Sequence, residues 1–408
     1  MTSREIVRAA INHRRPERIP CDFGGTKVTG IHADLYARLG KELGLDTELP
    51  KVYEQHQMLA RPEGYLLHWL NTDVVQVENP IETWGYRNQN WKIWKTSLNN
   101  RVLVPGDFMC ESDHEGNLYL FSDGNRIAKM AKEAIYFDRL MESNGGDLDL
   151  EIERADVKKY GKSIPLYTDE ELRCIEKNAK FLYENTEYSL HGGFMRGKFG
   201  NSAGVAHHDF TEWMIVMLTE PEYAKELMYV CQEAALKNLK MYLQACGKYI
   251  DTILISTTDF GTQRGEMISP AVFREIYQTG YKAINDYIHA NTDIKTMYHS
   301  CGSIRNIIPY FIEAGVDILN PVQTSAANMD LAKLKKEFGN DLVFWGGGMD
   351  TQNVLPNGTA EEIDAYVKDV MELMDGDGGF VFAAIHNLQP DVPFDNLCAL
   401  IDAFKKYR

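Results

Sequence analysis

The segment YHSCG holds an imidazole and a thiol two residues apart, at His299 and Cys301. In a β-strand, alternate residues face the same side, so both side chains would enter the same space. Imidazole nitrogen and thiolate sulfur are both good ligands for zinc. The pair therefore predicts a metal site. The competing interpretation is a hydrogen-bonded buried histidine beside an inert cysteine.

A later apolar run ends at His386, in the segment AAIHN. If the strand ends converge, as they do in a closed barrel, His386 becomes a third ligand beside His299 and Cys301. Three protein ligands with one open position are the arrangement of a catalytic rather than a structural zinc. The alternative is that His386 hydrogen-bonds to a loop or to a substrate.

Asp259 follows another apolar run, in the segment TTDFGTQ. Its carboxylate could bind the metal, orient His299 without binding the metal itself, or act as an acid or base. The ordinary role of an aspartate at such a position is to cap a helix, but Ser269, just before Pro270, is the better cap for the next helix. We therefore predict that Asp259, His299 and Cys301 are the catalytic residues.

The elements that must position these side chains are eight short strand-like runs that alternate with helical patterns. The clear helical patterns span residues 221–245, 270–289, 304–314, 329–338, 360–374 and 394–407. Several runs are almost continuously apolar, as in buried parallel strands. Eight strand–helix units predict a (β/α)8 TIM barrel. A doubly wound open sheet is the alternative, but no GxGxxG turn follows the first run. The runs span residues 18–24, 73–78, 189–196, 252–259, 294–301, 317–323, 341–349 and 379–386.

The rest of the chain indicates a single domain over residues 1–408, because it contains no repeat, low-complexity segment or linker. Thr2 and Glu5 have the spacing of a capping box, which predicts an N-terminal helical extension.

Residues 84–165, between the second and third runs, are too many for one connecting helix. Their DHEGNLYLFSDGNRI segment predicts a β-hairpin insertion with turns at both ends. Three tryptophans precede it, at Trp84, Trp91 and Trp94. We interpret the insertion as a lid over the barrel mouth. A surface hairpin without that role would have the same pattern.

The other runs end in polar residues and glycines. In a (β/α)8 barrel the carboxyl ends of the strands form the face that carries the active site. Such residues suit a mouth in which a ligand approaches the backbone closely, although turns use the same residue types. Taken together they form a ring. We expect substrate contacts from Gly25, Gln263, Asn320, Gln323, Asp350 and Gln352.

The composition excludes some classes of partner. With 59 acidic and 43 basic side chains the formal net charge is −16, which disfavours binding to nucleic acid or to an anionic membrane. No apolar run approaches the roughly 18–20 residues that span a bilayer, and the charged N-terminus lacks a signal-peptide core. The seven cysteines are scattered without a CxxC pair. These features favour a cytoplasmic protein.

Several segments together resemble the uroporphyrinogen decarboxylase-like superfamily, and within it the corrinoid-dependent methyltransferases, over nearly the whole chain. They are REIVRAAINHRRPERIPCDFGGT, TTDFGTQRGEMISPAVFREIY, YHSCGSI, GVDILNPVQ, FWGGGMDTQ and HNLQPDVPFDNL. The resemblance implies a (β/α)8 barrel. Decarboxylases of porphyrinogens carry an N-terminal RQAGRYLP-like segment with a substrate-binding arginine. Here CDFGGTKVTGIH occupies that region, which argues against porphyrinogen decarboxylation.

Members of the methyltransferase branch that this chain resembles bind zinc through a His-x-Cys pair and a later Cys. His299 and Cys301 match the pair, and His386 stands at the position of the later Cys. An imidazole in place of a thiolate makes the metal a stronger Lewis acid, which suits an ether oxygen or an amine as leaving group. The resemblance implies methyl transfer between a small methylated compound and a corrinoid. The aromatic residues of the insertion suggest a methoxylated aromatic as that compound, although tryptophans also stabilise a lid by packing.

The corrinoid would come on a separate protein, because the DxHxxG motif that binds cobalt is missing and Asp113-His114 has the wrong spacing. A homo-oligomer is compatible with the sequence. Two other functions stay open. One is a metal-free lyase of the decarboxylase type with Asp259 as its acid–base residue. The other is a non-catalytic ligand-binding barrel.

Overall fold

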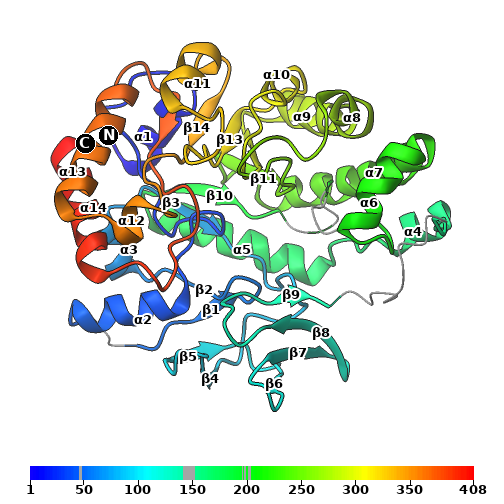
Figure 1. Ribbon diagram of the computed structural model, residues 1–408, viewed down its shortest axis with the longest axis horizontal. Helices are drawn as coiled ribbons and strands as arrows, with labels where there is room; N and C mark the ends of the chain where they lie inside the picture. Colours follow the sequence, from blue (N-terminus) through cyan, green and yellow to red (C-terminus); the bar gives the residue numbers. More distant parts are fainter. Residues whose placement is uncertain (46–47, 141–151, 195, 197–198, 201–203) are drawn as a thin grey trace.

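The computed structural model describes residues 1–45, 48–140, 152–194, 196, 199–200 and 204–408. Its main element is a curled parallel sheet of seven strands in the order β15-β14-β13-β12-β11-β10-β3 (Figure 1). Each strand lies inside one of the predicted runs. The strands are β3 (Val74–Val77), β10 (Ser189–Gly192), β11 (Thr252–Ser256), β12 (Lys295–His299), β13 (Ile318–Asn320), β14 (Val343–Trp345) and β15 (Phe380–Val381).

The first predicted run, 18–24, is not a regular strand, which corrects that part of the prediction. Cys21 forms a parallel bridge with Phe382, and its carbonyl accepts from the amide of Asp73, the residue before β3. Pro20 has no N–H to extend the ladder, and Gly24, with φ +79°, turns the chain away. The bridge still lies between β15 and β3, so the TIM-barrel-like fold is confirmed.

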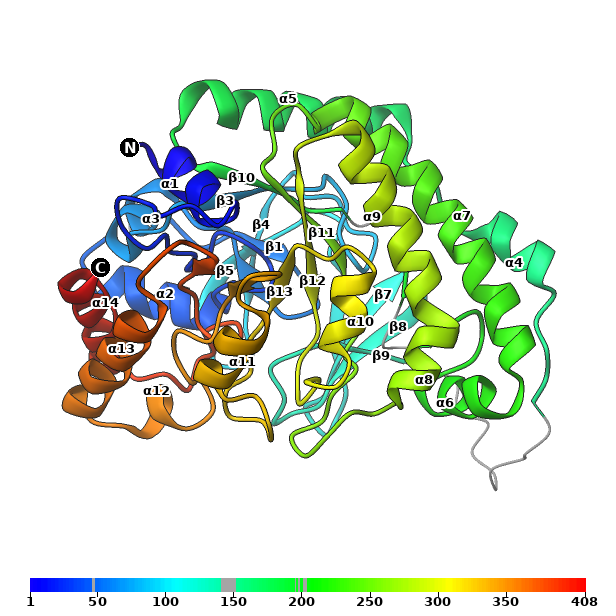
Figure 2. The same ribbon diagram turned by 90° about the horizontal axis from the view of Figure 1, so that it is seen from above.

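Helices connect the strands and form the outer layer (Figure 2). Their bounds are α1 (Ser3–Ala10), α2 (Ala33–Glu42), α3 (Gly64–Leu70), α4 (Val157–Ser163), α5 (Asp169–Asn185), α6 (Phe210–Thr219), α7 (Pro221–Cys246), α8 (Pro270–Phe273), α9 (Thr279–Asn291), α10 (Ile308–Glu313), α11 (Leu331–Phe338), α12 (Val354–Asn357), α13 (Ala360–Met374) and α14 (Phe394–Tyr407). A π-helical stretch, Arg274–Gln278, joins α8 to α9. In the part of the chain that the structure describes, no helix has the length and apolar character needed to cross a membrane.

The inside of the barrel is filled by a small apolar cluster, to which most strands contribute one or two residues. Side chains alternate along each strand, so one set faces inward and the other packs against the helices. Helix α1, whose predicted capping box is confirmed, adds Val7 and Ile11 to the inner cluster. From the strands come Val74, Leu254, Met297, Ile318, Val343, Trp345 and Val381. Two residues beyond Met297 and Ile318, the inward positions are polar, namely His299 and Asn320.

The insertion is larger than the single hairpin that the sequence predicts. The predicted segment supplies β7 (Leu118–Ser122) and the first part of β8 (Asn125–Met130), which pair with β6 (Cys110–Ser112) and β9 (Asp138–Arg139) in a four-stranded antiparallel sheet. A second hairpin of the insertion is formed by β4 (Lys92–Lys95) and β5 (Arg101–Val104). Earlier in the chain, before β3, the strands β1 (Val52–Glu54) and β2 (Leu59–Ala60) form another hairpin. These sheets lie together on one side of the barrel (Figure 1). Residues 141–151 of the predicted insertion fall outside the described residues.

Candidate metal centre

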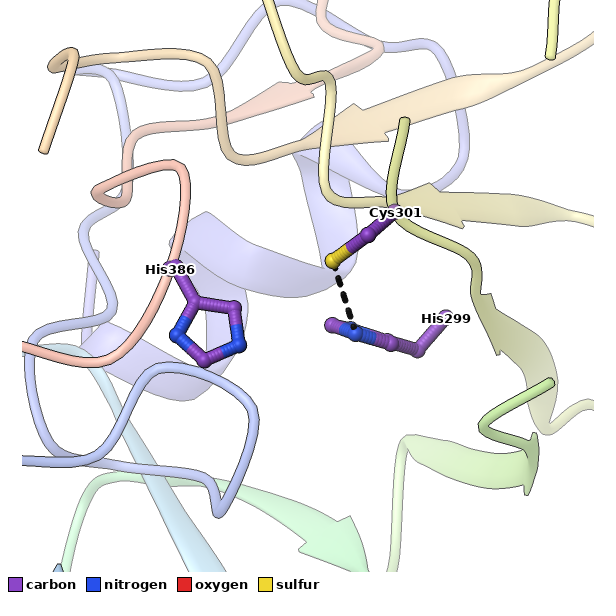
Figure 3. Close-up of side chains that lie close together, drawn as sticks. All are labelled: His299, Cys301 and His386. Carbon is purple, nitrogen blue, oxygen red and sulfur yellow. Dashed lines mark hydrogen bonds between the residues drawn. The ribbon is translucent and has the colours of Figure 1, made fainter. Parts of the chain in front are cut away.

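Three side chains that could hold a metal ion face one another at the carboxyl ends of the strands. His299 ends β12, Cys301 follows two residues later, and His386 lies in the loop after β15 (Figure 3). One potential ligand atom from each side chain lies within 4.8 Å of the other two. The structure thus brings together the three residues that the sequence proposes as metal ligands.

The hydrogen bonds around His299 fix which nitrogen faces the cluster. His299 and Asn320 are in register on neighbouring strands. The Nδ1 of His299 lies 2.6 Å from the Oδ1 of Asn320, whose Nδ2 donates to the carbonyl of Trp345 at 2.8 Å. Because that amide oxygen can only accept, Nδ1 carries the hydrogen, and Nε2 keeps its lone pair for a metal.

Cys301 is held by its backbone rather than by its sulfur. Its amide donates to Oδ1 of Asp259 at 2.7 Å, and the next amide, of Gly302, donates to Oε1 of Gln323 at 2.7 Å. These two bonds leave Sγ pointing at His299, 3.4 Å from Nε2. The carboxylate of Asp259 and the amide of Gln323 therefore position the loop that carries the thiol.

Asp259 lies at the edge of the cluster. Its Oδ1 is 3.9 Å from the Nε2 of His299, and its side chain is 38% exposed. Ser269, and not Asp259, caps the next helix, as the sequence indicates. Asp259 can therefore hold the Cys301 loop and still reach a molecule at the mouth. Its catalytic role remains a prediction.

His386 stands on a loop that the N-terminal part of the chain holds in place. The neighbouring Asn387 accepts from the amide of Gly30 at 2.5 Å and donates to Oε1 of Gln57 at 2.7 Å. The Nδ1 of His386 is buried and has no hydrogen-bond partner among the residues that the structure describes. An unpaired buried polar atom is costly unless a ligand satisfies it.

His386 and Cys301 are uncharged near neutral pH in the absence of a cation. Burial, reinforced by His299, lowers the pKa of His386 to about 4. Burial, reinforced by the nearby Asp259, raises the pKa of the Cys301 thiol well above its ordinary value. A cation would reverse the second effect, because a metal binds the thiolate and releases its proton.

These residues fit a zinc ion. Two ligands bound to one tetrahedral zinc at about 2.0 and 2.3 Å lie roughly 3.6 Å apart, and the Sγ of Cys301 is 3.4 Å from the Nε2 of His299. Two imidazoles and one thiolate leave one position open, and the unpaired Nδ1 of His386 gains a partner. The donor set and the spacing both support a catalytic type of zinc site.

Four of the six predicted substrate contacts form two pairs. Asn320 and Gln323 belong to the metal centre, where their side chains hold His299 and the Cys301 loop. Gln263 and Gln352 form an exposed pair on the rim, with Nε2 and Oε1 3.1 Å apart.

Two other predicted contacts are engaged within their own loops. Asp350 accepts from the amides of Gln352 and Asn353 and from the Asn353 side chain. The amide of Gly25 donates to Asp22, and a Cβ on Gly25 would meet the carbonyl of Val74. Substrate contact by these residues remains a prediction.

Sequence reasoning missed other polar groups of the barrel interior. His191 on β10 is in register with Gln76 on β3, and neither Nε2 has a partner among the described residues. Burial lowers the pKa of His191 to about 3, so its imidazole is neutral. Applied to the third run, the rule that strand ends carry chemistry would have found His191 in the segment LHGG.

A cavity of about 560 Å³ lies away from the metal centre, against β3 and α5. Polar side chains including Arg61, Gln76, Glu78 and Asn79 line it, and none of the three candidate ligands does. Donor chemistry and not cavity size therefore identifies the metal centre.

Comparison with known proteins agrees with the fold and with the sequence motifs. The sequence profile of the uroporphyrinogen decarboxylase (URO-D) family matches residues 149–407. The chain belongs to this family. None of the curated proteins searched matches the chain significantly.

Solved structures show the same fold. A methyltransferase from Methanosarcina mazei superposes with a TM-score of 0.59 at 16% sequence identity, over 100% of this chain and 99% of that one. A broad-specificity endoglucanase from Clostridium longisporum, at 14% identity, covers 65% of this chain and 95% of its own with a TM-score of 0.29. The first match shows a shared architecture along the full chain, and the second is too distant to carry an argument.

Proposed function

We propose that this protein is a zinc-dependent methyltransferase, which moves a methyl group between a small methylated substrate and a corrinoid carried by a separate protein. The observation that carries the proposal is the convergence of His299, Cys301 and His386, with the Nδ1 of His299 already engaged by Asn320. The URO-D family contains more than one chemistry, so family membership alone does not select this one. The methyltransferase of the same fold supports it.

Each residue has a defined part in the proposal. His299, Cys301 and His386 would hold the zinc, which supplies Lewis acidity to the heteroatom that carries the methyl group. Asn320 keeps His299 in the binding tautomer, and Asp259 and Gln323 keep Cys301 in place. An ether oxygen is a poor leaving group, so two imidazoles with a single thiolate suit it better than a thiolate-rich set. A methoxylated aromatic is therefore our preferred substrate class.

The first test is the zinc content of the purified protein and of His299→Ala, Cys301→Ala and His386→Ala. We expect about one zinc per chain in the wild type and almost none in each variant. His207→Ala and Cys398→Ala are matched controls, because one side chain is exposed and the other lies in α14. A wild type that binds no zinc from a zinc-buffered solution would overturn the metal part of the proposal.

The second test is methyl transfer from 2-methoxyphenol to reduced cobalamin, followed by the absorbance of methylcobalamin. We expect transfer that depends on both the zinc-loaded protein and the cobalamin. Decarboxylation of an added carboxylate by zinc-free protein, with no methyl transfer, would favour the lyase instead.

A further inference from the structure

Tyr136 belongs to the insertion, in the segment between β8 and β9. Hydrogen bonds of the residues before and after it fix its position. The carbonyl of Ile135 lies 3.3 Å from the Nε2 of His32. The carbonyl of Phe137 is 2.7 Å from the Nδ1 of His56, whose own carbonyl accepts from the Phe137 amide at 2.9 Å. The Phe137 side chain is fully buried. The phenol of Tyr136 is therefore carried on a well-anchored segment.

The phenol lies beside the loop that carries the candidate ligand His386. The Nε2 of Gln389 donates to the Oη of Tyr136 at 2.8 Å, and Gln389 is in the same loop as His386. Burial raises the pKa of Tyr136 to about 12, and the nearby Glu54, Asp391 and Cys301 add to the rise. The partly buried phenol of Tyr136 is thus in hydrogen-bond contact with the loop that carries His386.

The direction of the Gln389 bond leaves the phenol hydrogen available. Because Tyr136 accepts from Gln389, its own O–H points elsewhere, and none of the residues that the structure describes accepts a hydrogen bond from it. Tyr86, another tyrosine of the insertion, differs in this respect, since its hydroxyl donates to the carbonyl of Phe121 at 2.7 Å. Tyr86 is a structural tyrosine, whereas Tyr136 has a donor to offer to a bound molecule.

We propose that Tyr136 is a catalytic residue contributed by the insertion, and that its hydroxyl donates a hydrogen bond to the substrate heteroatom bound at the metal centre. This inference rests on the proposed methyl transfer. As the bond from carbon to the heteroatom breaks, its electron pair stays on the heteroatom while the methyl group passes to the reduced cobalt nucleophile. Tyr136 keeps its proton and stabilises the negative charge that develops. Tyr136 precedes the residues that match the family profile, 149–407, so family membership does not predict this role.

The test compares Tyr136→Phe with Tyr119→Phe, a matched control. Tyr119 is on β7 of the same sheet, and its hydroxyl donates to Asp113 at 3.2 Å, within the turn before that strand. We expect both variants to keep wild-type zinc content and melting temperature. Methyl transfer by Tyr136→Phe should fall about 10- to 100-fold, the range for losing a hydrogen bond to a charged group. The loss should be larger for methoxyarenes whose phenol product is less acidic.

A second readout does not depend on catalysis. The protein is loaded with Co²⁺ and titrated with azide, whose binding changes the visible spectrum of the metal. We expect the dissociation constant for azide to rise about tenfold in Tyr136→Phe and to stay unchanged in Tyr119→Phe.

The outcomes separate this inference from the proposed function. A wild type that binds azide but transfers no methyl group would overturn the proposed function, and the azide titration would still decide whether Tyr136 donates to a bound ligand. Equal azide affinity in Tyr136→Phe and the wild type would overturn the Tyr136 inference, and so would loss of zinc from Tyr136→Phe, because the phenol would then be only structural.

Discussion

Gly261 and Gly302 lie backbone to backbone, where the loops after β11 and β12 meet. A Cβ built on Gly302 would stand 2.3 Å from the carbonyl carbon of Gly261, and the φ of Gly302 is +88°. The contact brings the loop that carries Asp259 against the loop that carries Cys301. The short bond from the Cys301 amide to Asp259 depends on this close approach.

Gly302→Ala should therefore disturb the metal centre as well as the fold. The left-handed backbone and the clash with Gly261 should cost about 1–3 kcal/mol of unfolding free energy. Zinc affinity should fall at least about tenfold, because the amide that positions Cys301 would move. Gly265→Ala is the control, since nothing lies within 4 Å of a Cβ at that position. Urea unfolding and competition with a chelator measure the two effects. Equal behaviour of the two variants would contradict the prediction.

Asn320→Ala should weaken zinc binding, although Asn320 is not one of the candidate ligands. The Nδ1 of His299 would lose its acceptor, and the imidazole its fixed tautomer and orientation. We expect a decrease of about 10- to 100-fold in affinity, measured by chelator competition. Asn285→Ala is the matched control, because Asn285 is equally buried and bonds to Tyr298 and Ala314 on the helix side. That variant should lose stability but keep its zinc affinity. A larger zinc loss in the control would refute the positioning role.

Substitutions of Asp259 can separate positioning from chemistry. Asp259→Asn keeps an oxygen that accepts from the Cys301 amide, whereas Asp259→Ala removes it. Zinc affinity should be near that of the wild type in the first variant and about fivefold weaker in the second, the equivalent of one hydrogen bond. If the carboxylate acts as an acid or base, methyl transfer should fall about 100-fold in both. Wild-type transfer by Asp259→Asn would leave Asp259 only a positioning role.

The stability of the protein should depend on the ionisation of Asp22. Burial raises the pKa of Asp22 to about 6, although hydrogen bonds from Thr29 and Trp345 oppose the rise. The folded state then binds more protons than the unfolded state between about pH 4 and pH 6. The associated stability is fully present below the unfolded pKa and is lost as the pH rises through about 6, in total about 3 kcal/mol.

The unfolding free energies of the wild type and Asp22→Asn, compared from pH 4 to pH 8, test this dependence. The asparagine does not titrate, so the advantage of the wild type over the variant should shrink by that amount as the pH rises. A difference that stays constant with pH would mean that Asp22 is ionised throughout.

Local sequence patterns are sufficient to predict the elements with a strong hydrophobic period. The helix of residues 360–374 and the helix of residues 394–407 were predicted with the bounds that the structure has. Both have a strong 3.6-residue period, and a Thr359–Glu362 capping box starts the first. The run 18–24 was overestimated, because its apolar composition resembles a strand while Pro20 and Gly24 interrupt the ladder. The insertion was underestimated, since its short polar strands alternate weakly and their pairing is not local.

The candidate ligands could be predicted for a geometric reason, and their supporting residues could not. Strand ends of a closed barrel converge, so His299, Cys301 and His386 could be grouped before their distances were known. The bond between Asn320 and His299 depends on strand register, which the sequence does not reveal. The position of Tyr136 depends on how a distant sheet packs on the barrel. Such contacts become visible only in three dimensions.

The placement of His386 also matters for the durability of the fold. The chain between Cys301 and His386 includes β13, β14 and β15 together with the helices that join them. An ion shared by both ends would close this long segment into a loop, much as a disulfide would, in a chain whose seven cysteines are all free. Closing a long loop restricts the unfolded chain, and metal binding adds to folding free energy. Loaded and unloaded protein would then differ in how long they survive proteases and heat, as well as in what they catalyse.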